Sequence, residues 1–240
     1  WLDSALRHPE RGRYSFLAAD PFDYWQTTPS SGTDLAKLAA RLSQYATPAI
    51  RDLPPFQGGA AGVLGYGLGH ALETLPRPAF DEFQVPTLAL GWYDVVVAWD
   101  HAANSAWIVS QGLPELEPAA RQRRAAARLQ EFRQLLAGNP ASLQGGIRKS
   151  IAPIAPDQLA PQFPADGASG LTSNFSHAQY LRAAERAIRY VCEGDIFQVN
   201  LSQRFEARGP IDPLDLYRRL RRVSPAPYLA FLRWGDLAVV

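Results

Sequence analysis

The chain has 240 residues, and its 24 lysines and arginines balance 23 aspartates and glutamates to a formal net charge of +1. This balance gives no general electrostatic attraction to nucleic acid. With 47% hydrophobic and 20% charged residues, the composition is typical of a globular protein and not of a disordered one. No apolar run approaches the ~18 residues needed to span a bilayer. The single cysteine, Cys192, excludes an internal disulfide framework, so we expect a cytoplasmic protein.

The sequence contains no methionine, and it finishes on a strand-like apolar run from Leu237 to Val240. No turn or stop signal follows this run, so the strand lacks its continuation. We therefore expect the sequence to be part of a longer protein.

Local patterns in the first part of the chain predict both strands and a helix. Short aromatic runs bounded by glycine and proline predict strands at 13–17 and 22–25. Apolar residues at helical spacing then predict a helix over 33–45, which Thr33 or Asp34 can cap.

Residues 56–70 are rich in glycine, with six glycines between positions 58 and 69. Neither of the glycine patterns that cradle phosphates can be drawn through them, which argues against a nucleotide loop. We interpret residues 60–66 as a strand whose small side chains let another backbone approach closely.

Residues 88–99 form a long run that is rich in aromatic and β-branched side chains. Together with residues 105–110, this run predicts a hairpin. His101 falls in the turn between them, where we expect a solvated or turn-bonding role. The next segment, 114–137, is rich in alanine, leucine, glutamate, arginine and glutamine, so it predicts a helix that Gly138 ends.

Ser176 and Gln179 form a capping box at the start of a further predicted helix, which Gly194 closes. Its expected buried face consists of Tyr180, Ala184, Ala187, Ile188 and Val191. Residues 196–205 alternate between apolar and polar side chains, which predicts a strand. Its polar face suits either a polar ligand or water, and carries Gln198, Asn200, Ser202 and Arg204.

Asp212 and Pro213 open another predicted helix, since proline is favoured at the first helical position. Residues 228–234 and 237–240 then predict two strands around the turn at Gly235. The order of helices and strands indicates an α+β fold.

No complete catalytic constellation is present: the sequence has no nucleophile elbow and no paired carboxylates at an informative spacing. Cys192 at a helix end is typical of a small packed residue. The histidines provide no metal-site pattern, because no two of them are spaced at i, i+4; they are His8, His70, His101 and His177.

Several sequence blocks together resemble component I of the anthranilate and aminodeoxychorismate synthases. The most specific block is G-D-I-F-Q-V-N-L-S-Q-R-F at 194–205. The blocks that accompany it are L-D-S-A at 2–5, G-R-Y-S-F-L at 12–17, G-G at 58–59 with G-Y at 65–66, and P-A-P-Y at 225–228. The resemblance covers nearly the whole chain and is poorest in the segment 139–172.

Two positions depart from the family pattern, since Ser224 stands where asparagine is commoner and Gly67 replaces a usual aspartate. The Q-V-N-L version of the long block and the L-D-S-A opening resemble the aminodeoxychorismate branch of the family more than the anthranilate branch.

The resemblance implies a two-domain αβ sandwich of the anthranilate synthase component I type, with large antiparallel sheets flanked by helices and the second domain truncated. The implied division is an N-terminal domain at 1–138, a linker at 139–172 and the start of a chorismate-binding domain at 173–240.

The resemblance also implies an enzyme that replaces the 4-hydroxyl of chorismate with ammonia from a glutamine amidotransferase subunit or domain, for p-aminobenzoate and folate synthesis. Mg²⁺ is the implied cofactor. Its glutamate ligands and the catalytic groups are expected downstream of Val240, so no catalytic or metal-binding residue is predicted within the chain. The alternatives are an anthranilate synthase component I and, from another class, a non-catalytic tryptophan-sensing module.

The family resemblance further implies a pocket for tryptophan or a similar ligand. Carried onto this sequence, the pocket would use Ser4, Arg11, Gly12, Arg13, Tyr14, Pro227, Tyr228 and Leu229. The residue chemistry suits such a ligand, because arginine pairs with a carboxylate and tyrosine provides an aromatic wall. The alternative interpretation is that Tyr14 and Tyr228 belong to an ordinary interdomain core.

Overall fold

The computed structural model describes residues 1–6, 8, 11–27, 35–138, 159–165, 169–207, 209, 211–235 and 237–240. The chain forms two compact units. The first comprises Trp1–Pro76, Gln84–Ala152 and Asp212–Val240, and the second comprises Arg77–Phe83 and Pro153–Ile211. The division into domains inferred from the sequence stays a prediction, and much of its linker, residues 139–158, lies outside the described residues. No helix in the described ranges is long and apolar enough to cross a membrane.

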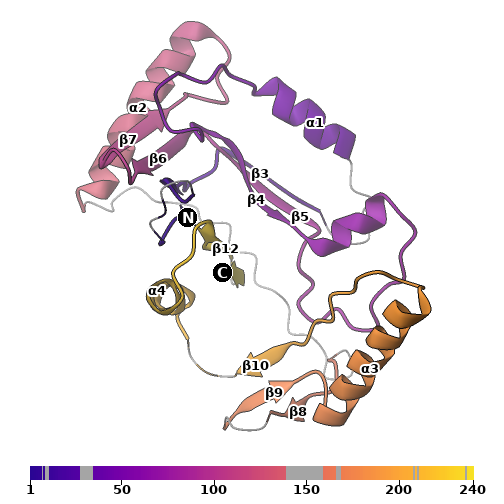
Figure 1. The fold of residues 1–240 in the computed structure, drawn as a ribbon. Helices are drawn as coiled ribbons and strands as arrows, with labels where there is room; N and C mark the ends of the chain where they lie inside the picture. Colours follow the sequence, from indigo (N-terminus) through magenta and orange to yellow (C-terminus); the bar gives the residue numbers. More distant parts are fainter. Residues whose placement is uncertain are drawn as a thin grey trace. The chain divides into compact units, whose positions relative to one another are not determined.

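A five-stranded antiparallel sheet in the first unit joins the beginning, the middle and the end of the chain (Figure 1). Leu2 pairs with Phe16 on one side and with Ala230 on the other. Residues far apart in sequence therefore meet in one layer. The strands, in spatial order, are β11 (Leu229–Ala230), β1 (Leu2–Asp3), β2 (Tyr14–Leu17), β6 (Val95–Asp100) and β7 (Ser105–Ser110).

A second sheet of this unit has the order β3 (Asp23–Thr27), β5 (Leu88–Tyr93) and β4 (Gly59–Leu64). The glycine-rich segment is a strand here, as the sequence predicts, and it continues into a short 3₁₀ helix, η1 (Tyr66–Ala71). A Cβ atom built on Gly62 would lie 2.0 Å from the carbonyl oxygen of Ala89. Close approach of the β5 backbone therefore requires glycine at this position.

The prediction of one continuous strand over residues 88–99 is wrong. The run breaks at Asp94 into β5 and β6, which belong to different sheets. Both halves are almost fully buried, so their apolar residues show no alternation that would mark the break. The return strand β7 pairs with β6 as expected.

Two helices belong to this part of the first unit. α1 (Leu35–Gln44) confirms the predicted helix, while its proposed caps Thr33 and Asp34 lie outside the described residues. α2 (Pro118–Leu136) begins four residues later than predicted, because Pro118 occupies its first turn. The side chain of Glu117 caps it and accepts hydrogen bonds from the amides of Ala119 and Ala120 at 3.0 and 2.7 Å.

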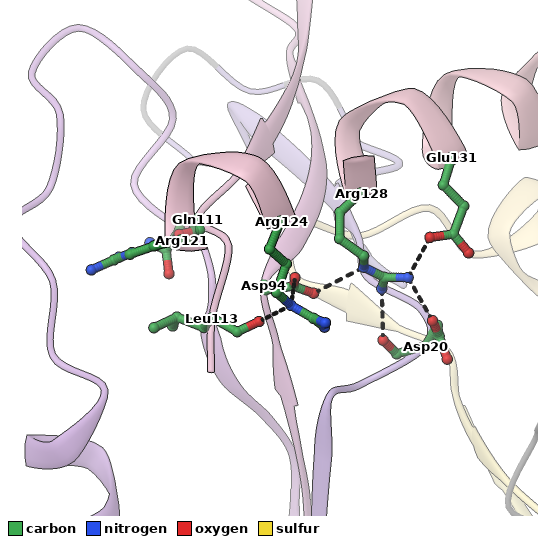
Figure 2. Close-up of polar contacts among 8 residues, drawn as sticks. All are labelled: Asp20, Asp94, Gln111, Leu113, Arg121, Arg124, Arg128 and Glu131. Carbon is green, nitrogen blue, oxygen red and sulfur yellow. Dashed lines mark hydrogen bonds and ion pairs between the residues drawn. The ribbon is translucent and has the colours of Figure 1, made fainter. Parts of the chain in front are cut away.

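Helix α2 is tied to the break between β5 and β6 by a network of charged side chains around Asp94 (Figure 2). Asp94 is fully buried, and its two oxygens lie 3.4 Å from Arg128 Nε and 3.4 Å from Arg124 Nε. Burial raises the pKa of Asp94, and the two arginines oppose this shift. Arg128 Nη1 also contacts Asp20 Oδ2 at 2.8 Å and Glu131 Oε2 at 2.7 Å. The two arginines of α2 therefore compensate the negative charge of Asp94.

The last segment of the first unit contains helix α4 (Pro213–Val223), followed by β11 and by the hairpin of β12 (Leu232–Trp234) and β13 (Leu237–Val239). Asp212 caps α4 by accepting a hydrogen bond from the Asp215 amide at 2.9 Å. These elements confirm the predicted helix and the last predicted strand, although Asp236 in the hairpin turn lies outside the described residues. The prediction of one strand over 228–234 is wrong, because the run breaks at Phe231 into β11, which pairs with β1, and β12, which pairs with β13.

The second unit consists of a three-stranded sheet and helix α3 (His177–Glu193). The strands, in spatial order, are β10 (Phe205–Ala207), β9 (Leu171–Ser173) and β8 (Phe163–Pro164). The predicted capping box of Ser176 and Gln179 is present, and Gly194 ends the helix in the left-handed conformation at φ +83°. Both ends of α3 thus follow from the sequence.

The predicted buried face of α3 is only partly correct. Tyr180, Ala184 and Ala187 are half-buried, whereas Ile188 and Val191 are 63% and 42% exposed. The helical spacing identified an apolar stripe but not which part of it is covered within the described residues.

The predicted strand over 196–205 is wrong, because residues 196–204 form no strand and only Phe205–Ala207 pairs with β9. Alternating residues form a strand only where a neighbour supplies hydrogen-bond partners, and no described segment does so here. Gln198, Asn200 and Ser202 are exposed, whereas Arg204 is half-buried. Arg204 instead forms an ion pair with Glu82, which also accepts a hydrogen bond from the Ala160 amide.

Replacing Arg128 with methionine should destabilise the first unit by about 3 kcal/mol, because the fully buried Asp94 would lose the more deeply buried of its two arginine partners. Urea denaturation measures this change. Arg123→Met is the matched control, since Arg123 is exposed on the same helix and should alter stability by less than about 0.5 kcal/mol. Equal stability of the two variants would contradict a structural role for the network.

Candidate functional site

A cavity of about 520 Å³ lies in the first unit, where the beginning of the chain meets β11. Six of the eight residues predicted for a ligand pocket line it: Ser4, Gly12, Arg13, Tyr14, Tyr228 and Leu229. Arg11 and Pro227 are not among its lining residues. Arg11 is exposed, while half-buried Pro227 packs behind Gly12.

Five further residues line the cavity that the sequence alone did not single out: Leu2, Asp3, Phe16, Pro55 and Ala230. Four of them lie in β1, β2 and β11 within two residues of predicted ones, and the pairing of Leu2 with Phe16 and Ala230 explains their presence. Pro55 comes from a loop that carries no motif, and nothing in its sequence marks it.

Backbone hydrogen bonds close the segment 226–231 against the first six residues. The amides of Ala5 and Leu6 both donate to the carbonyl of Ala226 at 3.2 Å. The Phe231 amide donates to the Trp1 carbonyl at 2.8 Å, and the Trp1 amino group donates to the Phe231 carbonyl at 2.8 Å. The two walls of the cavity are therefore parts of one hydrogen-bonded structure.

Gly12 lines this cavity at a position where a side chain would be strained and crowded. Its φ of +67° is in the left-handed region, and an added Cβ would lie 3.0 Å from the carbonyl oxygen of Leu6 and 3.2 Å from Cβ of Pro227. Tyr228 also has a positive φ, +63°, which is unusual for a bulky residue and costs of order 1–3 kcal/mol. Its side chain is 74% exposed.

Ser4 is buried, and its hydroxyl donates to the carbonyl of Tyr14 at 2.7 Å. Since a hydroxyl has one proton, the Ser4 oxygen can only accept a hydrogen bond from a ligand. The neighbouring Asp3 accepts hydrogen bonds from the Ser4 amide at 2.9 Å and from Ser15 Oγ at 3.0 Å.

Asp3 also binds two residues of α4. Tyr217 Oη donates to Asp3 Oδ2 at 2.9 Å, and Arg221 Nε donates to the same oxygen. Burial raises the pKa of Asp3, but hydrogen bonds from Arg221, Tyr217 and Ser15 outweigh this and hold it below its usual value. Asp3 is therefore ionised near neutral pH. Burial, followed by the hydrogen bond to Asp3, raises the pKa of the Tyr217 hydroxyl.

Arg13 stands at the edge of the cavity, about half exposed, and is fixed by Asp100. Its Nε contacts both carboxylate oxygens at 3.0 Å, and its Nη2 lies 2.5 Å from Oδ2. The guanidinium also lies 4.9 Å from the centre of the Tyr14 ring. Its remaining donors are therefore held in a fixed orientation.

His101, expected in a turn-bonding role, lies at the end of this arrangement. Its amide donates to the Arg13 carbonyl at 2.8 Å, and its Nε2 is 2.7 Å from Ser15 Oγ.

The cavity combines apolar and aromatic walls with few polar groups, and its volume lies in the range of small-molecule sites. It suits a ligand with an apolar or aromatic body and a polar end near Ser4 and Arg13. Among the described residues, no group of three or more His, Cys, Asp or Glu side chains could hold a metal ion. These residues do not fit the Mg²⁺ site that the resemblance implies, so no step through Mg²⁺ is derived from them.

The Asp100–Arg13 pair should contribute to stability in a pH-dependent way. The hydrogen bonds from Arg13 lower the Asp100 pKa to about 2, from about 3.9 in the unfolded chain. The contribution should be complete above about pH 4 and be lost as the pH falls toward 2. Urea midpoints measured across this range should therefore fall less steeply for Asp100→Asn than for the wild type.

Asp81→Asn is the control for this measurement, because Asp81 is exposed in the second unit. Superimposable pH profiles for the wild type and Asp100→Asn would contradict the assigned role of the pair.

Comparison with known proteins gives relatives along almost the entire chain. Anthranilate synthase component 1 of Streptomyces coelicolor is 32% identical over 226 residues, which cover 93% of this chain and 41% of that protein. Aminodeoxychorismate synthase component 1 of Bacillus subtilis is 27% identical over 248 residues, which cover 98% of this chain and 48% of that protein. The chain spans about half the length of these relatives.

The fold is similar to the crystal structure of anthranilate synthase component I from Streptococcus pneumoniae, with a TM-score of 0.66 at 23% identity. The match covers 97% of this chain and 50% of that one, and it confirms the predicted α+β fold class. The family model described as chorismate binding enzyme matches residues 7–240. The chain therefore belongs to the family of chorismate binding enzymes.

Proposed function

We propose that the protein containing this chain is component I of an aminodeoxychorismate synthase. It converts chorismate and ammonia to 4-amino-4-deoxychorismate, with the 4-hydroxyl leaving as water, and so supplies p-aminobenzoate and folate synthesis in the cytoplasm. Family membership over residues 7–240 supports the use of chorismate. The Q-V-N-L version of the block at 194–205 and the L-D-S-A opening carry the choice of this product.

The proposed reaction is a transaminase-class group transfer and requires parts that the described residues do not supply. Ammonia comes from a glutamine amidotransferase subunit or domain. As the family resemblance implies, the proposed Mg²⁺ is held by carboxylates downstream of Val240, since a bound Mg²⁺ needs well-placed carboxylates. This chain would then contribute to the enzyme a structural framework and the cavity between its first residues and β11.

An anthranilate synthase component I is the second candidate. It is favoured by the higher identities to enzymes of that name, 32% for Streptomyces coelicolor and 35% over 189 residues for Thermus thermophilus. The two candidates share substrate, metal and ammonia source, and they differ in the product.

The cavity is proposed to bind tryptophan or a similar aromatic amino acid. Arg13 would pair with the ligand carboxylate, Ser4 would accept from its ammonium group or ring N–H, and Tyr14, Tyr228 and Leu229 would contact the ring. Gly12 leaves the necessary space, and Pro227 would support the lining from behind Gly12. A non-catalytic tryptophan-sensing module would use the same cavity, but it would make no aminated product.

Incubation of the full-length protein with chorismate, Mg²⁺ and ammonium should yield 4-amino-4-deoxychorismate, identified by mass spectrometry. Omission of chorismate is the control. Anthranilate as the product would establish the second candidate, and binding of tryptophan without any aminated product would establish the sensing module.

Replacing Ser4 with alanine should weaken tryptophan binding about tenfold, because one hydrogen bond to a charged group contributes ~1.5–3 kcal/mol. Isothermal titration calorimetry measures the change. Ser43→Ala is the matched control, since the Ser43 hydroxyl also donates to a backbone carbonyl, that of Ala39, but on exposed α1. Equal heats of tryptophan binding for the wild type and Ser4→Ala would show that Ser4 does not contact the ligand.

A further inference from the structure

Asp3 forms part of the cavity wall, yet its carboxylate has no remaining capacity for a ligand. The residue is 2% exposed. Oδ1 accepts from the Ser4 amide at 2.9 Å and from Ser15 Oγ at 3.0 Å, and Oδ2 accepts from Tyr217 Oη at 2.9 Å and from Arg221 Nε. A carboxylate offers about four acceptor positions. All of them are therefore used within the protein.

The neighbouring Ser15 is occupied in the same way. Its single proton goes to Asp3, and its oxygen accepts from the Ser4 amide at 3.0 Å. His101 Nε2, 2.7 Å from the same oxygen, must then be the donor in that contact. The network of Asp3, Ser4, Ser15 and His101 is closed, so a ligand ammonium group finds no acceptor on Asp3 or Ser15.

The remaining partners of Asp3 lie on one face of α4, four residues apart. Tyr217 is fully buried, and its ring packs on Trp1 and Phe231 with centroid distances of 5.2 and 5.5 Å. Arg221 lies 5.5 Å from the Trp1 ring centre. Loss of the carboxylate would leave a buried phenol and a guanidinium without their acceptor, which is costly.

Helix α4 leads directly into the cavity wall. It ends at Val223, and Tyr228 and Leu229 line the cavity five and six residues later. Tyr228 has the strained φ of +63°, and strain of this kind persists only where the structure on both sides holds it. The pairing of β11 with β1 holds the chain after Tyr228 in place. The contacts of Asp3 with α4 hold the chain before Tyr228 in place.

We propose that Asp3 is a positioning residue, which holds α4 through Tyr217 and Arg221 so that residues 228–230 keep the shape of the cavity wall, and that it takes no part in binding the ligand. The statement about the ligand rests on the proposed aromatic amino-acid site. The statement about α4 does not depend on any ligand.

Hydrogen–deuterium exchange of the full-length protein without ligand tests the position of α4. In Asp3→Asn, amides of 213–230 should exchange about tenfold faster than in the wild type, since a charged hydrogen bond is lost. Tyr217→Phe, which removes one hydroxyl and keeps the ring, should give a smaller increase in the same segment. Amides of β5 should not change in either variant.

Two further variants sharpen this test. Asp3→Glu keeps the carboxylate and should restore slow exchange, whereas Arg218→Gln alters an exposed residue of α4 and should leave exchange as in the wild type. Unchanged exchange of 213–230 in Asp3→Asn and Tyr217→Phe, or an equal increase across both sheets, would overturn the proposal.

Calorimetry with tryptophan tests the statement about the ligand. If Asp3 acts through α4, Tyr217→Phe and Asp3→Asn should both weaken tryptophan binding, and Asp3→Glu should recover it. A loss in Asp3→Asn that Tyr217→Phe does not share would overturn the proposal, because it would mark Asp3 as a direct contact. Absence of tryptophan binding to the wild type would refute the proposed tryptophan site alone, while the exchange experiment would still decide the role of Asp3.

Discussion

The pairing of the first strand with two partners organises the candidate site. Leu2 and Asp3 lie between the strand at 14–17 and the pair Leu229–Ala230, so the chain joins its beginning to its end across more than 200 residues. The entropy needed to close such a loop grows only slowly with its length. Once the pairing forms, Asp3 is buried, α4 has its anchor, and both walls of the cavity exist.

Charge pairing fixes the positions of elements at three places in the first unit. Asp94 meets Arg124 and Arg128 where the chain passes between sheets, Asp3 meets Arg221 beneath the cavity, and Asp100 meets Arg13 at its edge. A buried carboxylate without such a partner is strongly destabilising, whereas a paired one contributes less to net stability than to a unique arrangement. In each case the arginine comes from a segment distant in sequence from the carboxylate. The pairs therefore specify which segments pack together.

Local rules were sufficient for several elements. The capping box of Ser176 and Gln179 and the glycine at 194 placed both ends of α3, because these signals act within a few residues. Small side chains identified the glycine-rich strand. Six of the eight residues predicted from the resemblance to known sequence blocks line the cavity, and their role in binding a ligand stays a prediction.

Non-local features were beyond sequence reasoning. Alternation over 196–205 suggested a strand, but strand formation depends on a neighbour that the segment itself does not encode. The break at Asp94 was hidden because both flanking strands are buried and show no period. The partners of Asp3 lie on α4, and the contribution of Pro55 comes from a loop, so neither could be found from spacing within one segment.

The left-handed backbone of Tyr228 lowers the stability of the folded protein but places an aromatic side chain in the cavity wall. Glycine at this position would relax the main chain and be favoured by the folding equilibrium, yet it would remove the aromatic side chain and loosen the turn between α4 and β11. Selection for a higher free energy of unfolding would then favour glycine at position 228, whereas selection for the shape of the cavity would favour tyrosine.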